Sequence, residues 1–540
     1  MPWLYSPWLL RNCPGEGYEF TKTSPELDLT LAISMSILLH SKLLPARIIV
    51  IQRNFVKDLL TAFFVLAAGI AHAQKTDTVA PTGESPTTTL AKSILIRGQA
   101  SSYVQELSDK FGTRLSGSQV YEQAAEWAVN KFRTNALPRV YTEVFLMPSG
   151  WERDAGSGRI LAPLRRPLHL ESLGWSPSTP RGGIRGPVTV LTELDSDYIS
   201  SRVAQIKGHI VLLFAEQDFG EHWTSFARRQ FASYSALKNA GALAILQPDV
   251  EYNDSLNADA ATWDGDLSPL PCAQIGMEDA KLIKRLGEKS VVEVEYEYHN
   301  HVWGPVEVRN VIAELPGRTR PDEWIVLGAH LDSWDYATGS QDNGTGVAMV
   351  LAAARALQAL PVRPDRSIRF VLWGGEEQGF LGSSAWIRLH RSELGQVVAY
   401  LNADNGAGHP QGWRVEGRRD VEKAMEPIRG LLSDLDGDGL SREVTFDSDH
   451  GPFMLEGVPV LDLWVETTSY LRVHHKAGDT FDKVDILNLN AGSAILAVTA
   501  YALADSPDSI AKQLDHVAVG EIVKGANIDL QLLKMLGWSF

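Results

Sequence analysis

The sequence has very few cysteines: only Cys13 and Cys272 occur among its 540 residues. Cys13 lies upstream of the candidate export signal described below, so the processed chain would keep one thiol, which cannot form an intramolecular disulfide. The 44% hydrophobic content instead allows large cores. We expect Cys272, in the segment LPCAQIG, to pack as a small hydrophobic side chain.

Long blocks of basic residues are absent as well. The chain has 50 Lys and Arg against 66 Asp and Glu, which gives a formal net charge of −16 at pH 7. The sequence therefore lacks the basic patch that binding to a nucleic acid would need. No internal repeat stands out, and the length predicts two or three domains.

A membrane-spanning apolar run is also missing near the start of the chain. The run LLTAFFVLAAGI is shorter than the roughly 20 residues that a spanning helix needs. Basic residues precede it, and the small-x-small sequence Ala-His-Ala follows and ends at Ala73, an order typical of a secretory signal. We expect residues 1–73 to be a signal region with an extension of doubtful relevance, cleavage near Ala73, a secreted or periplasmic protein and no stable membrane anchor.

The order of the later segments predicts one α/β domain interrupted by an insertion. A Thr, Pro and Ser-rich linker occupies 74–89, and helix-like and strand-like stretches fill 90–160. From 308 to 510 strands and helices alternate, which predicts an α/β catalytic domain that 90–160 completes. The segment 161–307 has short β-rich pieces punctuated by proline and glycine, and we interpret it as a compact domain inserted into the catalytic one.

The tail 511–540 has apolar residues at mixed spacing and no readable chemistry. Two interpretations of this tail remain open, packing on the catalytic domain or contact with a second copy in a homodimer. The sequence alone does not choose between them.

The clearest chemistry lies between Trp324 and Gly346. An apolar, β-branched strand pattern ends there and delivers His330 and Asp332, which are two residues apart and point to the same side of an extended backbone. A loop rich in Gly, Ser and Asn then reaches Asp342 and continues into a helical pattern that stops at Pro361. Open α/β sheets place their sites at such strand ends.

Three further strand patterns end in similar residues. SIRFVLW is followed by Glu376 and Glu377, VVAYLNAD ends in Asp404, and the loop after VPVLDLW reaches the pair His474-His475. Histidines combined with carboxylates suit two zinc ions with an open position for water. An all-oxygen calcium or magnesium cage would not need the histidines.

At this point the sequence resembles the di-zinc exopeptidases that include bacterial leucyl aminopeptidases and carboxypeptidase Q. The matching motifs are GAHLDSWD, the DNG turn, WGGEEQGFLGS, LNADNGAG, SDHGPF and HHKAGDTFDKVD. The resemblance implies a zinc-exopeptidase fold (phosphorylase/hydrolase-like), a mixed central β-sheet flanked by helices. It also implies that 161–307 is a β-rich protease-associated (PA) domain, as in the carboxypeptidase Q branch.

Carried over residue by residue, the resemblance implies roles for the residues at the strand ends. One zinc would bind His330 and Asp404, the other Glu377 and His475, and Asp342 would bridge both ions. Glu376 would be the general base, and Asp332 would orient His330. Asp449 and His450 would lie along the substrate cleft.

The expected activity is hydrolysis of dipeptides or short peptides at a free terminus. The motifs leave open whether that terminus is the amino or the carboxyl end. Two other functions are compatible with the same architecture, a non-catalytic binding ectodomain and a single-zinc glutaminyl cyclase. The complete set of candidate ligands favours the peptidase.

Overall fold

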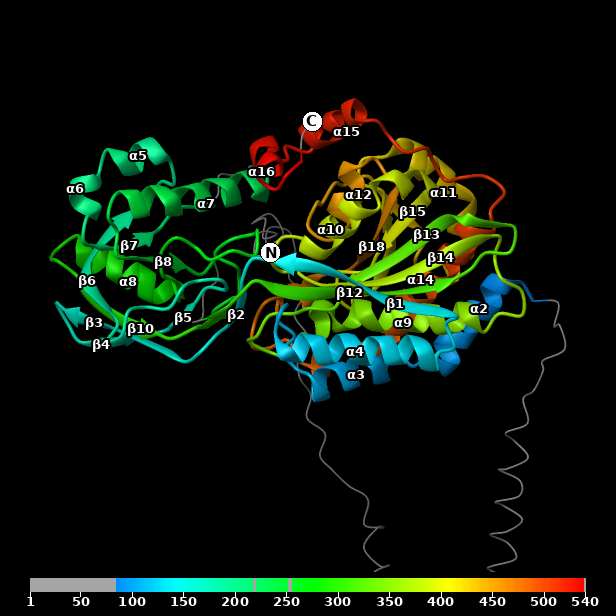
Figure 1. Ribbon diagram of the computed structural model, residues 1–540, viewed down its shortest axis with the longest axis horizontal. Coiled ribbons are helices and arrows are strands. Elements are labelled where there is room, and N and C mark those ends of the chain that lie inside the picture. Colours follow the sequence, from blue (N-terminus) through cyan, green and yellow to red (C-terminus); the bar gives the residue numbers. More distant parts are fainter. Residues whose placement is uncertain (1–83, 217–219, 251–254, 539–540) are drawn as a thin grey trace, which may run out of the picture. The chain divides into compact units, whose positions relative to one another are not determined.

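The computed structural model describes residues 84–216, 220–250 and 255–538. The expected signal region, its cleavage position and Cys13 lie outside these residues. Two eight-stranded sheets and a two-stranded ribbon organise the described chain, and helices pack against the sheets (Figure 1). The α/β class expected from the sequence is confirmed.

The first sheet has four parallel strands at its centre, β14, β13, β15 and β18. Because they run in the same direction, their carboxyl ends meet at one edge of the sheet. Strands β12 and β16 flank them and run antiparallel to β14 and β18. Across the sheet the order is β1 (Arg139–Met147), β12 (Val306–Leu315), β14 (Arg366–Trp373), β13 (Arg320–His330), β15 (Val397–Asn402), β18 (Val460–Val465), β16 (Pro410–Arg414) and β17 (Gly439–Ser441).

Both faces of this sheet are covered by helices (Figure 1). Alternate residues of β14 enter two different cores, Phe370 on one side and Val371 on the other. This explains why the strand is buried throughout and reads as a nearly continuous apolar run. One core contains α2 (Pro86–Arg97), α3 (Ala100–Lys110), α4 (Gln119–Thr134), α9 (Thr345–Gln358), α11 (Arg419–Leu432) and α14 (Ile486–Asp505), and the other contains α10 (Leu381–Leu389) and α12 (His450–Leu455).

Among the described helices, α14 alone is long and apolar enough to cross a membrane by length and composition. Most of it is buried inside the protein, where it packs against α2 and α9. Asp485 begins the helix by accepting the backbone N–H groups of Leu487 and Asn488. We therefore interpret α14 as a core helix.

The second sheet is formed by the chain between β1 and β12. Its strand order is β4 (Arg166–Leu168), β3 (Gly156–Ala162), β10 (Glu293–Tyr298), β6 (Ile184–Leu191), β7 (Ile210–Leu213), β8 (Ala244–Pro248), β9 (Cys272–Ile275) and β5 (Leu170–Ser172). Its helices are α5 (Ser196–Ser200), α6 (Val203–Ile206), α7 (Trp223–Asn239) and α8 (Met277–Gly287). The chain leaves the first sheet through β2 (Gly150–Glu152) and returns through β11 (His301–Trp303), and these two strands pair as a ribbon.

The second sheet already includes β3, which starts at Gly156, ahead of the boundary at 161 that the sequence suggested. Assignment of this segment to the PA type stays a prediction. Cys272 lies on β9 and is fully buried, as expected of a small hydrophobic side chain.

Two local features refine the expected boundaries. The helix-like stretch that starts near residue 90 is divided between α2 and α3, because Gly98 takes an extended conformation (φ −60°, ψ 146°) that ends α2. Helix α2 also starts inside the expected linker, at Pro86, where Ser85 accepts the backbone N–H of Thr88.

The C-terminal tail packs on the rest of the chain. It forms α15 (His516–Gly525) and α16 (Leu530–Met535), and Val523, Leu533 and Trp538 enter the core that contains α10 and α12. Asp529 pairs with Arg228 of α7 at 2.9 Å, which links the tail to the inserted segment. Packing on the domain is therefore one role of the tail; contact with a second copy stays a prediction.

Candidate metal centre

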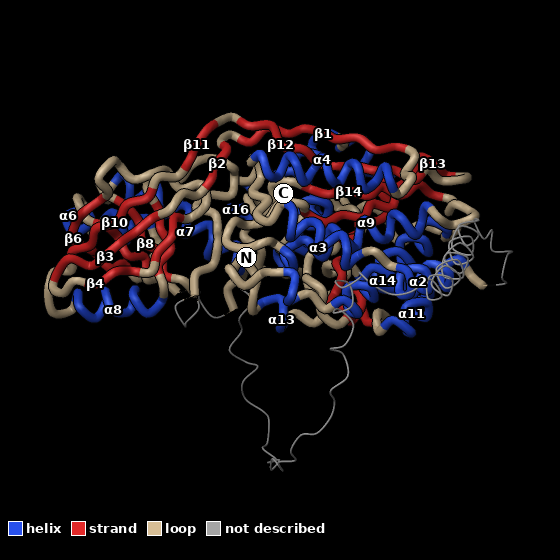
Figure 2. The backbone as a smooth tube through the Cα atoms, turned by 90° about the horizontal axis from the view of Figure 1, so that it is seen from below, coloured by secondary structure: helices blue, strands red, loops and turns tan. Residues whose placement is uncertain are grey.

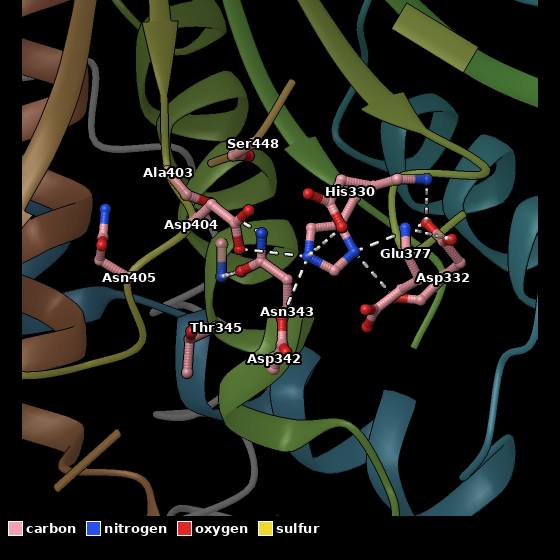
Figure 3. Close-up of polar contacts among 12 residues, drawn as sticks. His330, Asp332, Asp342, Asn343, Thr345, Glu377, Ala403, Asp404, Asn405 and Ser448 are labelled. Carbon is pink, nitrogen blue, oxygen red and sulfur yellow. Dashed lines mark hydrogen bonds and ion pairs between the residues drawn. The ribbon is translucent and has the colours of Figure 1, made fainter. Parts of the chain in front are cut away.

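The candidate ligands expected from the sequence converge at the carboxyl edge of the central parallel strands (Figure 3). His330 is the last residue of β13, and Glu376 and Glu377 follow β14. Asp404 follows β15, and the chain after β18 passes through α13 (Thr468–Leu471) before it reaches His475. Residues far apart in the sequence are brought together because they end neighbouring strands.

His330 faces two carboxylates with one ring nitrogen. Its Nε2 lies 3.1 Å from Asp342 Oδ1 and 3.1 Å from Asp404 Oδ1. Its Nδ1 lies 3.0 Å from the backbone carbonyl oxygen of Asp332, which accepts a hydrogen bond from a protonated Nδ1. Nε2 is then the ring nitrogen that faces the carboxylates and that a metal ion would use, the arrangement that a metal-binding histidine needs.

A second group lies on the other side of Asp342. Asp342 Oδ2 is 3.3 Å from His475 Nε2, which is also 3.0 Å from Glu377 Oε2. His474 Nε2 lies 3.4 Å from the same Asp342 oxygen, and its ring stacks on His475 with centroids 3.9 Å apart. The other Glu377 oxygen, Oε1, is buried and has no hydrogen-bond partner. The two oxygens of Asp342 therefore face two separate groups of donors.

These donor sets fit zinc. Two ligand atoms about 2.1 Å from one tetrahedral zinc ion lie roughly 3.4 Å from each other, and the closest atoms of the two groups are 3.0–3.3 Å apart. Candidate ligand atoms lie within 4.8 Å of one another in three sets: Asp342, His474 and His475; His330, Glu376 and Glu377; and His330, Asp342 and Asp404. The Glu377 oxygen without a hydrogen-bond partner is a further atom that could bind a metal ion.

Burial gives the carboxylates of this centre unusual acidities. It raises the pKa of Glu376 well above its usual value, helped by the charges of Asp404 and Glu377. Burial is also the main cause that raises the pKa of Glu377 and of Asp404. For Asp342, burial is outweighed by the hydrogen bonds of His330 and His475, which hold its pKa well below the usual value. Buried carboxylates that repel one another require bound cations or protons.

Asp332 connects two of the strand ends. It is fully buried, and its Oδ1 lies 3.5 Å from His330 Nδ1. Its two oxygens also accept the backbone N–H groups of Glu376 and Glu377, each at 3.4 Å, and the hydroxyl of Ser116 at 3.0 Å. Asp332 therefore holds the backbone of the glutamate pair as well as facing the histidine.

Two buried residues that sequence reasoning did not assign support the loop that carries Asp342. Asp479 accepts the backbone N–H groups of Gln341 at 2.7 Å and Asp342 at 3.0 Å. The guanidinium of Arg114 donates at 2.8 Å to four backbone carbonyls, those of Gly112, Leu331, Thr338 and Gly339. Neither interaction has a signal in the sequence, because one partner in each case is backbone.

A cleft opens over this centre. Its lining includes Glu376, Glu377, Asp342 and Asp404, and further lining residues come from the loops around them: Asp259, Trp263, Gly379, Phe380, Asn405, Asp447, Thr467, Tyr470, Leu471, His474 and His475. Asp259 and Trp263 belong to the inserted segment. No sequence pattern selects Asp259, which follows no strand and carries no motif.

The structure does not place Asp449 and His450 along this cleft, in contrast to the expectation. Both side chains are fully buried, because the SDH sequence leads into α12, whose first turn packs beneath β15 and β18. Asp449 accepts the hydroxyl of Ser383 at 2.5 Å, and His450 lies 3.2 Å from the hydroxyl of Thr445. Asp447, two residues earlier, lines the cleft instead.

Comparison with known proteins finds similar peptidases. Residues 310–500 match the model of peptidase family M28. Carboxypeptidase Q of Xenopus laevis is 29% identical over 434 residues, which cover 78% of this chain and 90% of that protein. A peptidase M28 precursor from Shewanella amazonensis superposes with a TM-score of 0.71 and 27% identity, covering 79% of this chain and 98% of the other.

The fold is also that of BSAP, a zinc aminopeptidase from Bacillus subtilis. The two structures superpose with a TM-score of 0.58 at 22% identity, covering 78% of this chain and 98% of the other. The family match spans β13, β14, β15 and β18, whose carboxyl ends carry the candidate ligands. Residues 310–500 of this chain are therefore similar to peptidase family M28, and this similarity supports a peptidase function.

Proposed function

We propose that the protein is an exported di-zinc exopeptidase that hydrolyses dipeptides or short peptides at a free terminus. The observation that carries this proposal is the position of Asp342, whose two oxygens face His330 on one side and His475 on the other. A carboxylate shared between two groups of nitrogen and oxygen donors suits a pair of metal ions. The names of the similar proteins, carboxypeptidase Q and zinc aminopeptidase, support the same class of reaction.

In this proposal His330 and Asp404 would hold one zinc, Glu377 and His475 would hold the other, and Asp342 would serve both. His475 is preferred to His474 as a ligand because only His475 also contacts Glu377, at 3.0 Å. Asp332 keeps Nδ1 of His330 protonated and so orients its Nε2.

When bound, zinc polarises the scissile carbonyl and lowers the pKa of a water molecule. The remaining work falls to Glu376, which lines the cleft and lies 4.0 Å from His330 Nε2. Its carboxylate accepts a proton from the attacking water and then delivers it to the leaving amine. Burial of Glu376, which is 7% exposed, raises its pKa and suits it to both steps.

Export is the second part of the proposal. It rests on the order of basic, apolar and small residues that ends at Ala73. Amino-terminal sequencing of the protein recovered from the periplasm or medium should begin near Gln74. A mature protein that retains residues before Gln74 would contradict cleavage at this position.

The metal and the base can be tested together. The purified protein should contain about two zinc ions per chain, lose dipeptide hydrolysis when chelated and recover it with zinc. Glu376→Gln should keep its zinc but lose roughly 10²- to 10⁴-fold in turnover, whereas Glu126→Gln, at an exposed position of α4, should behave like wild type.

Full activity of Glu376→Gln would show that the base is assigned wrongly. A folded protein that binds no zinc would instead favour the non-catalytic ectodomain. One zinc per chain, with cyclisation of amino-terminal glutamine, would favour the cyclase.

A further inference from the structure

The charges of the cleft bear on which end of a peptide it accepts. Besides the candidate ligands and Glu376, the lining includes two acidic residues, Asp259 and Asp447. No lysine or arginine is among the described residues that line it. A carboxylate-terminal peptide needs a cation to receive its end, whereas a free α-ammonium needs an acceptor. The lining supplies carboxylate acceptors but no lysine or arginine.

Asp259 is held rigidly beside a candidate metal ligand. The residue before it, Ala258, donates its backbone N–H to the carbonyl of His475 at 2.7 Å. The carbonyl of Asp259 accepts the N–H of Gly174 at 2.8 Å, and its Oδ1 accepts the N–H of Ala260 at 2.7 Å. Backbone contacts on both sides therefore fix where this carboxylate stands relative to the metal centre.

The Asp259 carboxylate can also accept further hydrogen bonds. Within the described residues, the hydrogen bond from Ala260 is the one contact recorded for its oxygens, and no lysine or arginine pairs with it. Its side chain is partly buried, and burial raises its pKa. A partly buried carboxylate without a cationic partner is a strong acceptor for a charged ligand group.

Metal loading would leave this charge in place. Two zinc ions would balance the four carboxylates of Asp342, Glu376, Glu377 and Asp404. Asp447 lies 3.9 Å from the Nε2 of His450, which also faces Glu416 at 3.8 Å. Among the described residues no lysine, arginine or histidine forms an ion pair with the Asp259 carboxylate, which therefore stays available to a ligand.

We propose that Asp259 receives the free α-ammonium group of the substrate, so that the enzyme removes residues from the amino end. This inference rests on the proposed function, because it assigns the polarity of that same cleft. Asp259 is a specificity-determining residue supplied by the inserted segment. Recognition requires an unblocked amino group and is indifferent to whether the far end of the substrate is a carboxylate or an amide.

The opposite polarity would depend on cations outside the cleft. Arg472 and Lys476 line a neighbouring cavity, together with Arg153 and Glu171. Lys476 Nζ already donates to the carbonyls of Leu471 and Arg472, at 3.3 and 3.4 Å. A carboxypeptidase would have to reach Arg472 from the metal centre, and that polarity is the competing outcome of the test.

Three matched substrates separate the two polarities: a dipeptide, its N-acetyl derivative and its carboxyl-terminal amide. The zinc-loaded wild type should cleave the dipeptide and the amide at similar kcat/KM, and the N-acetyl derivative at least about 100-fold more slowly. Asp259→Asn keeps an oxygen for the Ala260 N–H but loses the charge, so kcat/KM for the dipeptide should fall roughly 10- to 100-fold. The loss should be larger in KM than in kcat, with zinc content unchanged.

Asp264→Asn is the matched control. Asp264 lies in the same segment, is exposed and does not line the cleft. It should leave all three kcat/KM values unchanged. If Asp259→Asn behaves like this control, or if the amide is resistant while the N-acetyl derivative is cleaved, the inference is overturned while the peptidase function stands.

A binding measurement makes the inference independent of turnover. In the zinc-loaded Glu376→Gln variant, calorimetry should show that the dipeptide and its amide bind, that the N-acetyl derivative binds at least about tenfold more weakly, and that adding Asp259→Asn removes this difference. The same pattern in a wild type that hydrolyses none of the substrates would support the ammonium site and refute the proposed function. Equal binding of all three ligands would refute the ammonium site.

Discussion

Replacing Asp479 tests whether the loop that carries Asp342 is held by a single buried carboxylate. Asp479 is 3% exposed, and each of its oxygens accepts one backbone N–H, from Gln341 and from Asp342. In Asp479→Asn one of these oxygens becomes an NH₂ group, so that a side-chain N–H donor lies opposite a backbone N–H donor. In Asp479→Ala both hydrogen bonds are lost.

The geometry sets the size of each effect. A buried N–H left without an acceptor costs about 1–3 kcal/mol, so Asp479→Asn should destabilise by an amount in this range and Asp479→Ala by more. Removing the charge also removes repulsion from Asp342, which offsets part of the loss. The zinc affinity should fall roughly 10- to 100-fold, as for other groups that support a metal ligand.

Urea unfolding of the metal-free protein measures the stability term, and competition with a chelator measures zinc affinity. Asp482→Asn is the control, since Asp482 lies in the same loop, is exposed and pairs with Lys483; its effect should stay within about 0.5 kcal/mol. If Asp479→Asn matches this control in both assays, the backbone contacts of Asp479 do not support the site.

Three further predictions concern other residues. Arg114→Lys should destabilise the protein by about 3 kcal/mol in urea unfolding, because one ammonium group cannot replace a guanidinium that serves four carbonyls. His475→Ala should lose one zinc ion by metal analysis, whereas His474→Ala should keep both, since His474 approaches Asp342 but not Glu377. Burial raises the pKa of Cys272 to about 12, so a thiol reagent at pH 8 should modify it only after unfolding, and rapid reaction of the native protein would contradict its burial.

His330, Glu376, Glu377 and Asp404 share one physical feature: they lie at or just after the ends of neighbouring parallel strands. An apolar run followed by a polar residue, as at His330 and Asp404, can be recognised in the sequence. Because the two strands lie side by side in the sheet, the residues at their ends lie close together. The order of β14, β13, β15 and β18 then decides which residues meet. The convergence of these four positions could therefore be anticipated without knowing the loops, whereas Asp342 and His475 lie in loops.

Interactions made through the backbone could not be anticipated in the same way. Nothing in the sequence shows that Asp479 will accept two N–H groups or that Arg114 will bind carbonyls, because those partners carry no side-chain signature. The expected position of Asp449 along the cleft differs from the structure for a related reason. Its motif lies near the site in space, but the start of α12 turns it inward, away from the cleft.

The inserted segment contributes to the metal centre itself. His475 adopts a left-handed backbone conformation with φ of 58°, which costs a non-glycine residue about 1–2 kcal/mol. The hydrogen bond from Ala258 to its carbonyl holds it there, and Trp334 packs edge-on against its ring with centroids 6.0 Å apart. Trp334 in turn meets Trp175 of the inserted segment, at 6.4 Å.

This support has a consequence for specificity. The backbone N–H of Ala258 fixes His475, and the next residue, Asp259, presents its carboxylate to the same cleft. A shift of this loop of the insertion would therefore move a metal ligand and the proposed ammonium acceptor together. Because both depend on adjacent residues, changes in the insertion that alter substrate choice should also alter zinc affinity, unless they are confined to the Asp259 side chain.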